Sequence, residues 1–175
     1  TTRLVGSEMC IRDRTAPARP HGRPVTEIQM ADLLREVRRR FDFCLLDAPA
    51  GLGRGFQLAT CAADRCVVVT TADASSLRDA QHTVMELDRF PAGALHLVVN
   101  RVRKKLLRQL HATIDDAIDK AGLPLLGVVP EDDALPLCMN RGVPILLADG
   151  QSAATAYRNI AKRLQGERVP LLRIR

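Results

Sequence analysis

The residues from Phe41 to Gly51 constrain the fold of this chain more strongly than any other segment. They form a short apolar run that ends at Asp47 and continues into a turn of small residues. An apolar run between polar flanks is typical of a strand that is buried on both faces, as in a parallel sheet. The sequence therefore predicts a strand over residues 43–47, with an acid at the carboxyl end, where α/β folds place their ligands.

The chemistry of this strand end suits a nucleotide. In nucleotide hydrolases an acid at this position holds Mg²⁺ or orients the attacking water. Gly51 can bring its backbone N–H close to a terminal phosphate because it has no Cβ. An ordinary strand exit, in which Asp47 accepts hydrogen bonds from the local backbone, explains these residues equally well when they are taken alone.

The rest of the chain alternates between helical and extended patterns. Apolar runs predict further strands over residues 66–71, 95–100 and 125–129, and a short extended piece over 145–147. Periodicity, capping residues and glycine stops predict helices over residues 26–40, 55–62, 76–89, 113–121, 133–140 and 152–165. Thr26 with Gln29 and Ser76 with Asp79 have the spacing of a capping box. Alternation of strands and helices indicates βαβ units and a mostly parallel sheet with flanking helices.

The charge of the chain gives little support for a nucleic-acid partner. The formal net charge of +6 gathers at the two ends, in residues 1–24 and 168–175, whereas the residues between them balance. Aromatic residues make up only 3% of the chain, which argues against stacking platforms for single-stranded nucleic acid. Five cysteines without a C-x-x-C pair favour a reduced, cytoplasmic compartment.

Five sequence blocks occur in a fixed order along the chain. They are Asp47–Gly51, Cys66–Thr71 with Ser75–Ala80, Leu97–Val102, Pro124–Asp132 with Asn140–Pro144, and Ala156–Leu171. Together they resemble the C-terminal two-thirds of the MinD branch of the MinD/ParA family of P-loop ATPases, over residues 41–172. The first block is similar to the DSPAG switch of that family, and the second to its VVTTPEVSSVRDA segment. The resemblance implies a P-loop NTPase fold, which is Rossmann-like.

The resemblance also implies roles for residues around a nucleotide. Asp47 would be the Walker B-type acid, catalytic and in indirect contact with Mg²⁺, and Gly51 would donate its N–H to the γ-phosphate. Asn100, with Arg101 beside it, matches the family's contact to the base, although a single Asn after a strand is also a common turn former.

Two further pairs follow from the same resemblance. Pro130 and Asp132 would flank the base or the ribose. Arg78 and Asp79 lie where relatives bind partner proteins or their dimer mate, and an ion pair at the start of a helix is the alternative reading.

The function that the resemblance implies is placement of the bacterial division septum. Such an ATPase uses ATP and Mg²⁺, forms a homodimer in the ATP state, and works with a MinC-like inhibitor and a MinE-like or other activator. The intact protein would be cytoplasmic and peripheral to the inner membrane. A ParA-type partitioning or flagellar-placement ATPase is one alternative, and a non-enzymatic interaction module derived from such an ATPase is the other.

The chain also departs from the family pattern. It contains no G-x-x-x-x-G-K-[ST] motif, and its first lysine is Lys104. We therefore expect a fragment that lacks the first strands and the P-loop and that cannot hydrolyse ATP alone. Residues 1–24 read as a disordered or non-native leader, 25–172 as an incomplete ATPase domain, and 173–175 as a truncated tail. Membrane binding would require a C-terminal amphipathic helix in the full protein.

Overall fold

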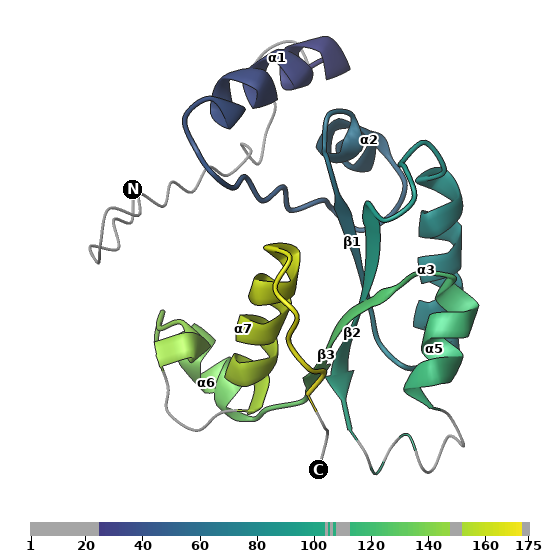
Figure 1. The fold of residues 1–175 in the computed structure, drawn as a ribbon, viewed down its shortest axis with the longest axis vertical. Coiled ribbons are helices and arrows are strands. Elements are labelled where there is room, and N and C mark those ends of the chain that lie inside the picture. Colours follow the sequence, from purple (N-terminus) through teal and green to yellow (C-terminus); the bar gives the residue numbers. More distant parts are fainter. Residues whose placement is uncertain (1–24, 104, 106, 108–112, 148–151, 173–175) are drawn as a thin grey trace. The chain divides into compact units, whose positions relative to one another are not determined.

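The computed structural model describes residues 25–103, 105, 107, 113–147 and 152–172 (Figure 1). The chain divides into two compact units, one up to Leu45 and the other from Leu46 onward, and each is described by itself. The leader expected at residues 1–24 and the tail expected at residues 173–175 lie outside the described residues.

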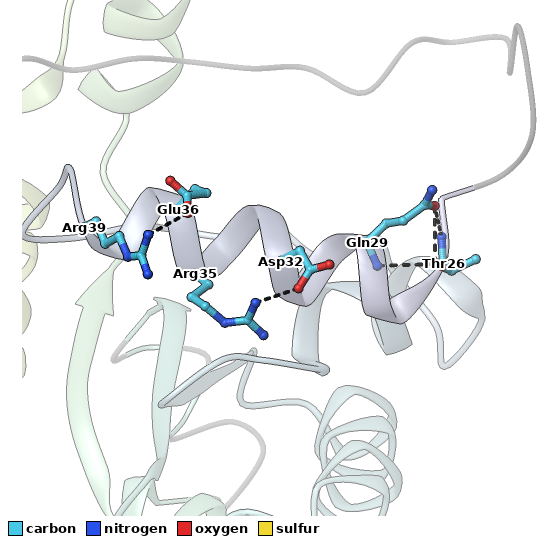
Figure 2. Close-up of polar contacts among 6 residues, drawn as sticks. All are labelled: Thr26, Gln29, Asp32, Arg35, Glu36 and Arg39. Carbon is cyan, nitrogen blue, oxygen red and sulfur yellow. Dashed lines mark hydrogen bonds and ion pairs between the residues drawn. The ribbon is translucent and has the colours of Figure 1, made fainter.

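The first unit contains helix α1, Glu27–Arg38, which begins with the predicted capping box. The Thr26 hydroxyl oxygen accepts a hydrogen bond from the backbone N–H of Gln29 at 3.3 Å. In return, the Gln29 side-chain oxygen accepts one from the backbone N–H of Thr26 at 3.0 Å (Figure 2). Two backbone donors that the helix itself leaves unpaired are satisfied in this way.

Ion pairs one turn apart link the charged side chains of α1. Arg35 pairs with Asp32 at 2.7 Å, and Arg39 pairs with Glu36 at 3.0 Å (Figure 2). All four side chains are more than half exposed, so each pair stabilises the helix by only about 0.2–0.5 kcal/mol. The arginines at this end of α1 therefore belong to a solvated helix face.

The predicted strand over residues 43–47 does not form, and this prediction is wrong. Phe43 and Leu45 are 66% and 90% exposed, although the pattern indicated burial on both faces. An apolar extended segment becomes a strand only when neighbouring strands satisfy its backbone amides and carbonyls. Among the described residues no strand pairs with this segment. The pattern correctly indicates apolar character but cannot supply the neighbour.

The second unit is built on a sheet of three parallel strands in the order β1-β2-β3. The strands are β1 Cys66–Thr70, β2 Leu95–Val102 and β3 Leu125–Pro130. Val68 lies opposite Leu97, and Val98 lies opposite Gly127. The predicted α/β class with a parallel sheet is confirmed.

Strand β1 lies at an edge of this described sheet. It pairs with β2 on one flank and with no described strand on the other. Val67 and Val69 are 38% and 59% exposed, whereas Val68 between them is 7% exposed. Alternate side chains point to opposite faces, so one face of β1 is covered and the other is open.

Helices lie on both faces of the sheet. Figure 1 shows α3 and α5 on one face and α7 on the other. The first core gathers around Leu97, Val99 and Val128, and the second around Val98, Leu126 and Val129. The helical elements are α2 Arg54–Thr60, α3 Ala74–Glu86, α5 Ile114–Ala121, α6 Ala134–Asn140, the 3₁₀ turn η1 Ile145–Leu147, and α7 Ser152–Leu164.

Helix α7 packs closely against the sheet at Gly127 in β3. A Cβ atom added there would lie 2.4 Å from Cγ1 of Ile160, closer than real Cβ atoms come to any neighbour. The absence of a side chain at residue 127 therefore lets the helix pack directly on the strand.

Three local predictions have different outcomes. Helix α5 begins after Thr113 and ends at Gly122 in the left-handed conformation, as predicted. Helix α3 begins earlier than predicted, because the N-cap is Asp73 and not Ser76. Residues 145–147 form a 3₁₀ turn and not an extended piece, since no described strand offers them a partner.

Candidate functional site

The carboxyl ends of all three strands meet at one edge of the sheet, because the strands are parallel. Asn100 is near the end of β2, and Pro130 is the last residue of β3. The two predicted base-contact positions therefore lie on the same edge. This edge is where open α/β sheets bind their ligands.

The backbone of β2 is irregular at this edge. The pairing of β2 with β3 shifts between Val99 and Val102, so Asn100 and Arg101 leave the regular ladder. Arg101 has a φ of 53°, and among the described residues it is the one non-glycine residue with a positive φ. The side-chain oxygen of Asn100 accepts a hydrogen bond from the Arg101 backbone N–H at 2.9 Å.

Glu131 ties this irregular segment to the residue after β3. Its carboxylate pairs with the guanidinium of Arg101 at 3.5 Å and also with that of Arg103. Its backbone N–H donates to the carbonyl oxygen of Val102 at 3.1 Å. The Glu131 side chain is 20% exposed, whereas both arginines are more than 60% exposed. Sequence reasoning did not single out Glu131.

Asp132 joins two helix starts. One carboxylate oxygen accepts from the Ala134 N–H at 3.1 Å, at the start of α6. The other accepts from the Ala153 N–H at 3.2 Å and from the Ser152 hydroxyl at 3.4 Å, at the start of α7. A negative charge at helix N-termini is favourable. The predicted contact of Asp132 with a base or ribose stays a prediction beside this structural role.

A compact polar network follows β1 on the same edge. The Thr71 hydroxyl bonds to the carboxylate of Asp73 and lies 2.8 Å from the Ser76 hydroxyl oxygen. The Ser76 backbone N–H donates to Asp73 at 3.0 Å. These bonds, with the Thr71 hydroxyl first, lower the pKa of Asp73 to about 2. The network therefore fixes a charged carboxylate at the start of α3.

The remaining residues predicted to contact the nucleotide, Asp47 and Gly51, lie at the end of the segment where a strand was predicted. Asp47 is exposed and lies in irregular backbone, so its carboxylate does not point into a core. Gly51 has a φ of 86°, a left-handed conformation that L side chains adopt at a cost. The space beside Gly51 is open, since a Cβ there would meet nothing within 4 Å, so a ligand could approach its backbone N–H.

Arg78 and Asp79 lie on the exposed side of α3. The residues that flank them, Leu77 and Ala80, are both 4% exposed and belong to the core. Arg78 and Asp79 are exposed, so both side chains are accessible to a partner. Their predicted partner or dimer role stays a prediction.

Two shallow grooves lie away from the predicted site residues. One, of about 570 Å³, includes His96, Pro124 and Leu125 and so opens at the amino ends of β2 and β3. The other, of about 360 Å³, includes Thr60 and Arg89.

Neither a metal cluster nor a membrane span is evident in the described part of the chain. No group of three or more His, Cys, Asp and Glu residues there is arranged to hold a metal ion. Within the same ranges, every helix is too short or too polar to cross a lipid bilayer.

The sequence of the chain matches one family model and several curated proteins. A family model described as "Cellulose biosynthesis protein BcsQ" matches residues 16–163. The septum site-determining protein MinD of Bacillus subtilis is 37% identical over 145 residues, which cover 82% of this chain and 54% of that protein. The chain spans about half the length of the curated relatives it matches.

Solved structures give the same picture. A chain of the MinC:MinD cell division protein complex of Aquifex aeolicus is similar to this chain, with a TM-score of 0.80 and 29% identity. The match covers 86% of this chain and 63% of the chain in the complex. MinD complexed with Mg-ADP from Pyrococcus horikoshii has a TM-score of 0.68 and 25% identity, covering 79% and 56%.

Proposed function

Because the chain belongs to the MinD/ParA family of ATPases, which the BcsQ model and the MinD relatives represent, we propose that it forms the base-binding part of an ATP site in a septum-placing protein. The observation that carries this proposal is the position of Asn100 and Pro130 on one edge of a parallel sheet. At that edge a carboxamide and a turn are available for a nucleotide base.

The amide of Asn100 suits this task because it can both donate and accept hydrogen bonds. Its oxygen already accepts from the Arg101 N–H, which leaves its NH₂ group to donate to a ring nitrogen of adenine. Pro130 and the backbone around Asp132 would flank the base or ribose from the neighbouring strand.

The phosphate side of the site would involve residues 47–51. One MinD relative was solved as a complex with Mg-ADP, which supports ATP and Mg²⁺ as ligands of the parent protein. Asp47 would orient the attacking water and contact the ion indirectly, and Gly51 would offer its N–H to the γ-phosphate. Bound Mg²⁺ would neutralise charge that develops on the phosphates.

We further propose that the 175 residues do not hydrolyse ATP alone. The sequence holds no lysine-bearing phosphate loop. The loop would belong to the part of the matched relatives that this chain does not span. The parent protein would then dimerise around ATP. The MinC:MinD complex of a relative supports a MinC-like inhibitor as a partner, and we propose that it would bind at Arg78 and Asp79.

A chimera tests the ATP site. Residues 41–172 would replace the matching part of B. subtilis MinD, and hydrolysis of Mg-ATP would be measured. We expect turnover that Asp47→Ala lowers by at least about 100-fold, because the variant loses the group that orients water. Asp42→Ala, an exposed acid five residues earlier, is the matched control and should leave turnover unchanged. Equal loss in both variants, or none in either, would contradict the assignment of Asp47.

The partner surface has a separate test. In the same chimera, Arg78→Glu should weaken binding of a MinC-like inhibitor at least about tenfold, because reversal of a charge in an interface is costly. Arg158→Glu, on the exposed side of α7, is the control. Undiminished binding by Arg78→Glu would place the partner surface elsewhere.

A further inference from the structure

The irregular end of β2 concentrates strain next to a candidate ligand group. Arg101 adopts a left-handed conformation, with φ at 53°, which a residue with a Cβ enters only when its surroundings hold it there. The register of the pairing with β3 shifts across this residue, between Val99 and Val102. Irregularities of this kind near sites serve to re-aim a side chain.

The left-handed turn aims the carboxamide of Asn100. The Arg101 N–H donates to the Asn100 side-chain oxygen at 2.9 Å, a bond that depends on the orientation of the peptide between these two residues. If Arg101 relaxed to a negative φ while the backbone on either side stayed in place, ψ of Asn100 would have to change with it. The peptide between the two residues would then rotate, its N–H would turn, and this bond would be lost. The direction of the Asn100 amide therefore depends on the backbone of Arg101.

Glu131 contacts each of the three residues that follow Asn100. Its carboxylate pairs with the guanidinium groups of Arg101 and Arg103, and its N–H donates to Val102 at 3.1 Å. At 20% exposure, its carboxylate is more shielded from solvent than either arginine. One residue from the end of β3 thus holds the irregular end of β2 by three contacts.

We infer that Glu131 is a positioning residue: it holds Arg101 in the left-handed conformation and so orients the Asn100 carboxamide for a nucleotide base. This inference rests on the proposed function for its ligand, a purine base with a ring nitrogen that accepts from the Asn100 NH₂ group. The orientation itself exists without any ligand.

The test uses the ¹⁵N-labelled 175-residue chain and the variant Glu131→Gln, which removes the charge and keeps the size. Hydrogen exchange at the Arg101 amide should become about three- to tenfold faster, as expected for the loss of partly exposed ion pairs. The NH₂ signals of the Asn100 side chain should move toward those of a solvated amide. Glu167→Gln, which removes a carboxylate 4.0 Å from Lys162 at the end of α7, is the control and should change neither signal.

A second substitution separates positioning from general support of the fold. Glycine adopts positive φ at no steric cost, so Arg101→Gly added to Glu131→Gln should restore the Asn100 side-chain signals. Unchanged Asn100 signals in Glu131→Gln, or failure of the glycine to restore them, would overturn the inference. Because neither measurement involves a nucleotide, absence of ATP hydrolysis by the chimera would overturn the proposed function and leave this result intact.

Discussion

The guanidinium of Arg163 in α7 donates two hydrogen bonds to the carbonyl oxygen of Val169, at 2.8 Å from Nε and 2.6 Å from Nη2. The same side chain reaches β3, where its Nη1 donates to the carbonyl oxygens of Leu125 and Leu126 at 3.4 Å and 3.1 Å. One residue thus ties a helix, a strand and the segment after Gly166. A rigid fork with several donors is needed for this geometry.

Replacement of Arg163 should release the segment that follows α7. We expect Arg163→Met to lower the free energy of unfolding by about 1–3 kcal/mol, since several carbonyls lose their donor. Trypsin should also cut after Arg168 faster, because the bond lies in the segment that Arg163 holds. Arg158→Met is the control: Arg158 is exposed on the same helix and donates to the Leu146 carbonyl, away from the segment after Gly166. Equal cleavage after Arg168 in both variants would contradict this prediction.

Asp132 should matter more for stability than its neighbour Asp133. Asp132→Ala removes the acceptor at two helix starts and should cost about 1–2 kcal/mol in urea unfolding. Asp133 is the N-cap residue of α6 by position but makes no side-chain capping bond. Asp133→Ala should therefore change stability by less than about 0.5 kcal/mol. A similar loss in both variants would mean that the double cap is not what stabilises these helices.

The charge of Asp73 should support folding over a defined range of pH. The pKa of Asp73 is lowered to about 2 in the folded chain, against about 4 when the chain is unfolded. A lowered pKa means that the stabilisation is present above about pH 4 and is lost as the pH falls through about 2. The group is largely exposed, so solvent screening reduces the size of the effect.

An NMR titration of the Asp73 carboxyl tests its cause. Thr71→Val removes the hydroxyl that contributes most and should raise the pKa of Asp73 toward its ordinary value. Thr83→Val is the matched control, because the Thr83 hydroxyl bonds to the Asp79 carbonyl and does not touch Asp73. If the Asp73 pKa stays at about 2 in Thr71→Val, the Thr71 hydroxyl is not the main cause of the lowered pKa.

Gly127→Ala should crowd the contact between β3 and α7. The added Cβ would meet Ile160 at 2.4 Å, and overpacking of this kind costs about 1–3 kcal/mol. Adding Ile160→Ala should recover part of the loss that Gly127→Ala causes, which a double-mutant cycle would detect. Gly53→Ala is the control, since a Cβ there would meet nothing within 4 Å. Full stability of Gly127→Ala would show that α7 can shift away.

The elements that local sequence determines could be predicted, and those that depend on distant partners could not. The capping box at Thr26, the helix start at Thr113 and the stop at Gly122 are set within four residues, and the structure contains all three. The capping box predicted at Ser76 is wrong, because Asp73 caps α3 instead. The extended segment at 43–47 needs neighbouring strands, which no local pattern can provide.

The same limit applies to the candidate site. The motifs placed Asn100 and Pro130 on one edge, because strand direction follows from alternation of strands and helices. The role of Glu131 could not be predicted, because its pairing with Arg101 and Arg103 depends on the register between two strands about thirty residues apart in the sequence. A left-handed arginine carries no signal in sequence comparable to that of glycine.

The flank of β1 that no described strand pairs with has a practical consequence for handling the protein. Its backbone amide and carbonyl groups, with the exposed Val67 and Val69 beside them, can pair with an added strand. We therefore expect the purified protein to aggregate as it is concentrated. A polypeptide that contributes a well-matched strand to this flank should keep the preparation clear, and light scattering during concentration would report the difference.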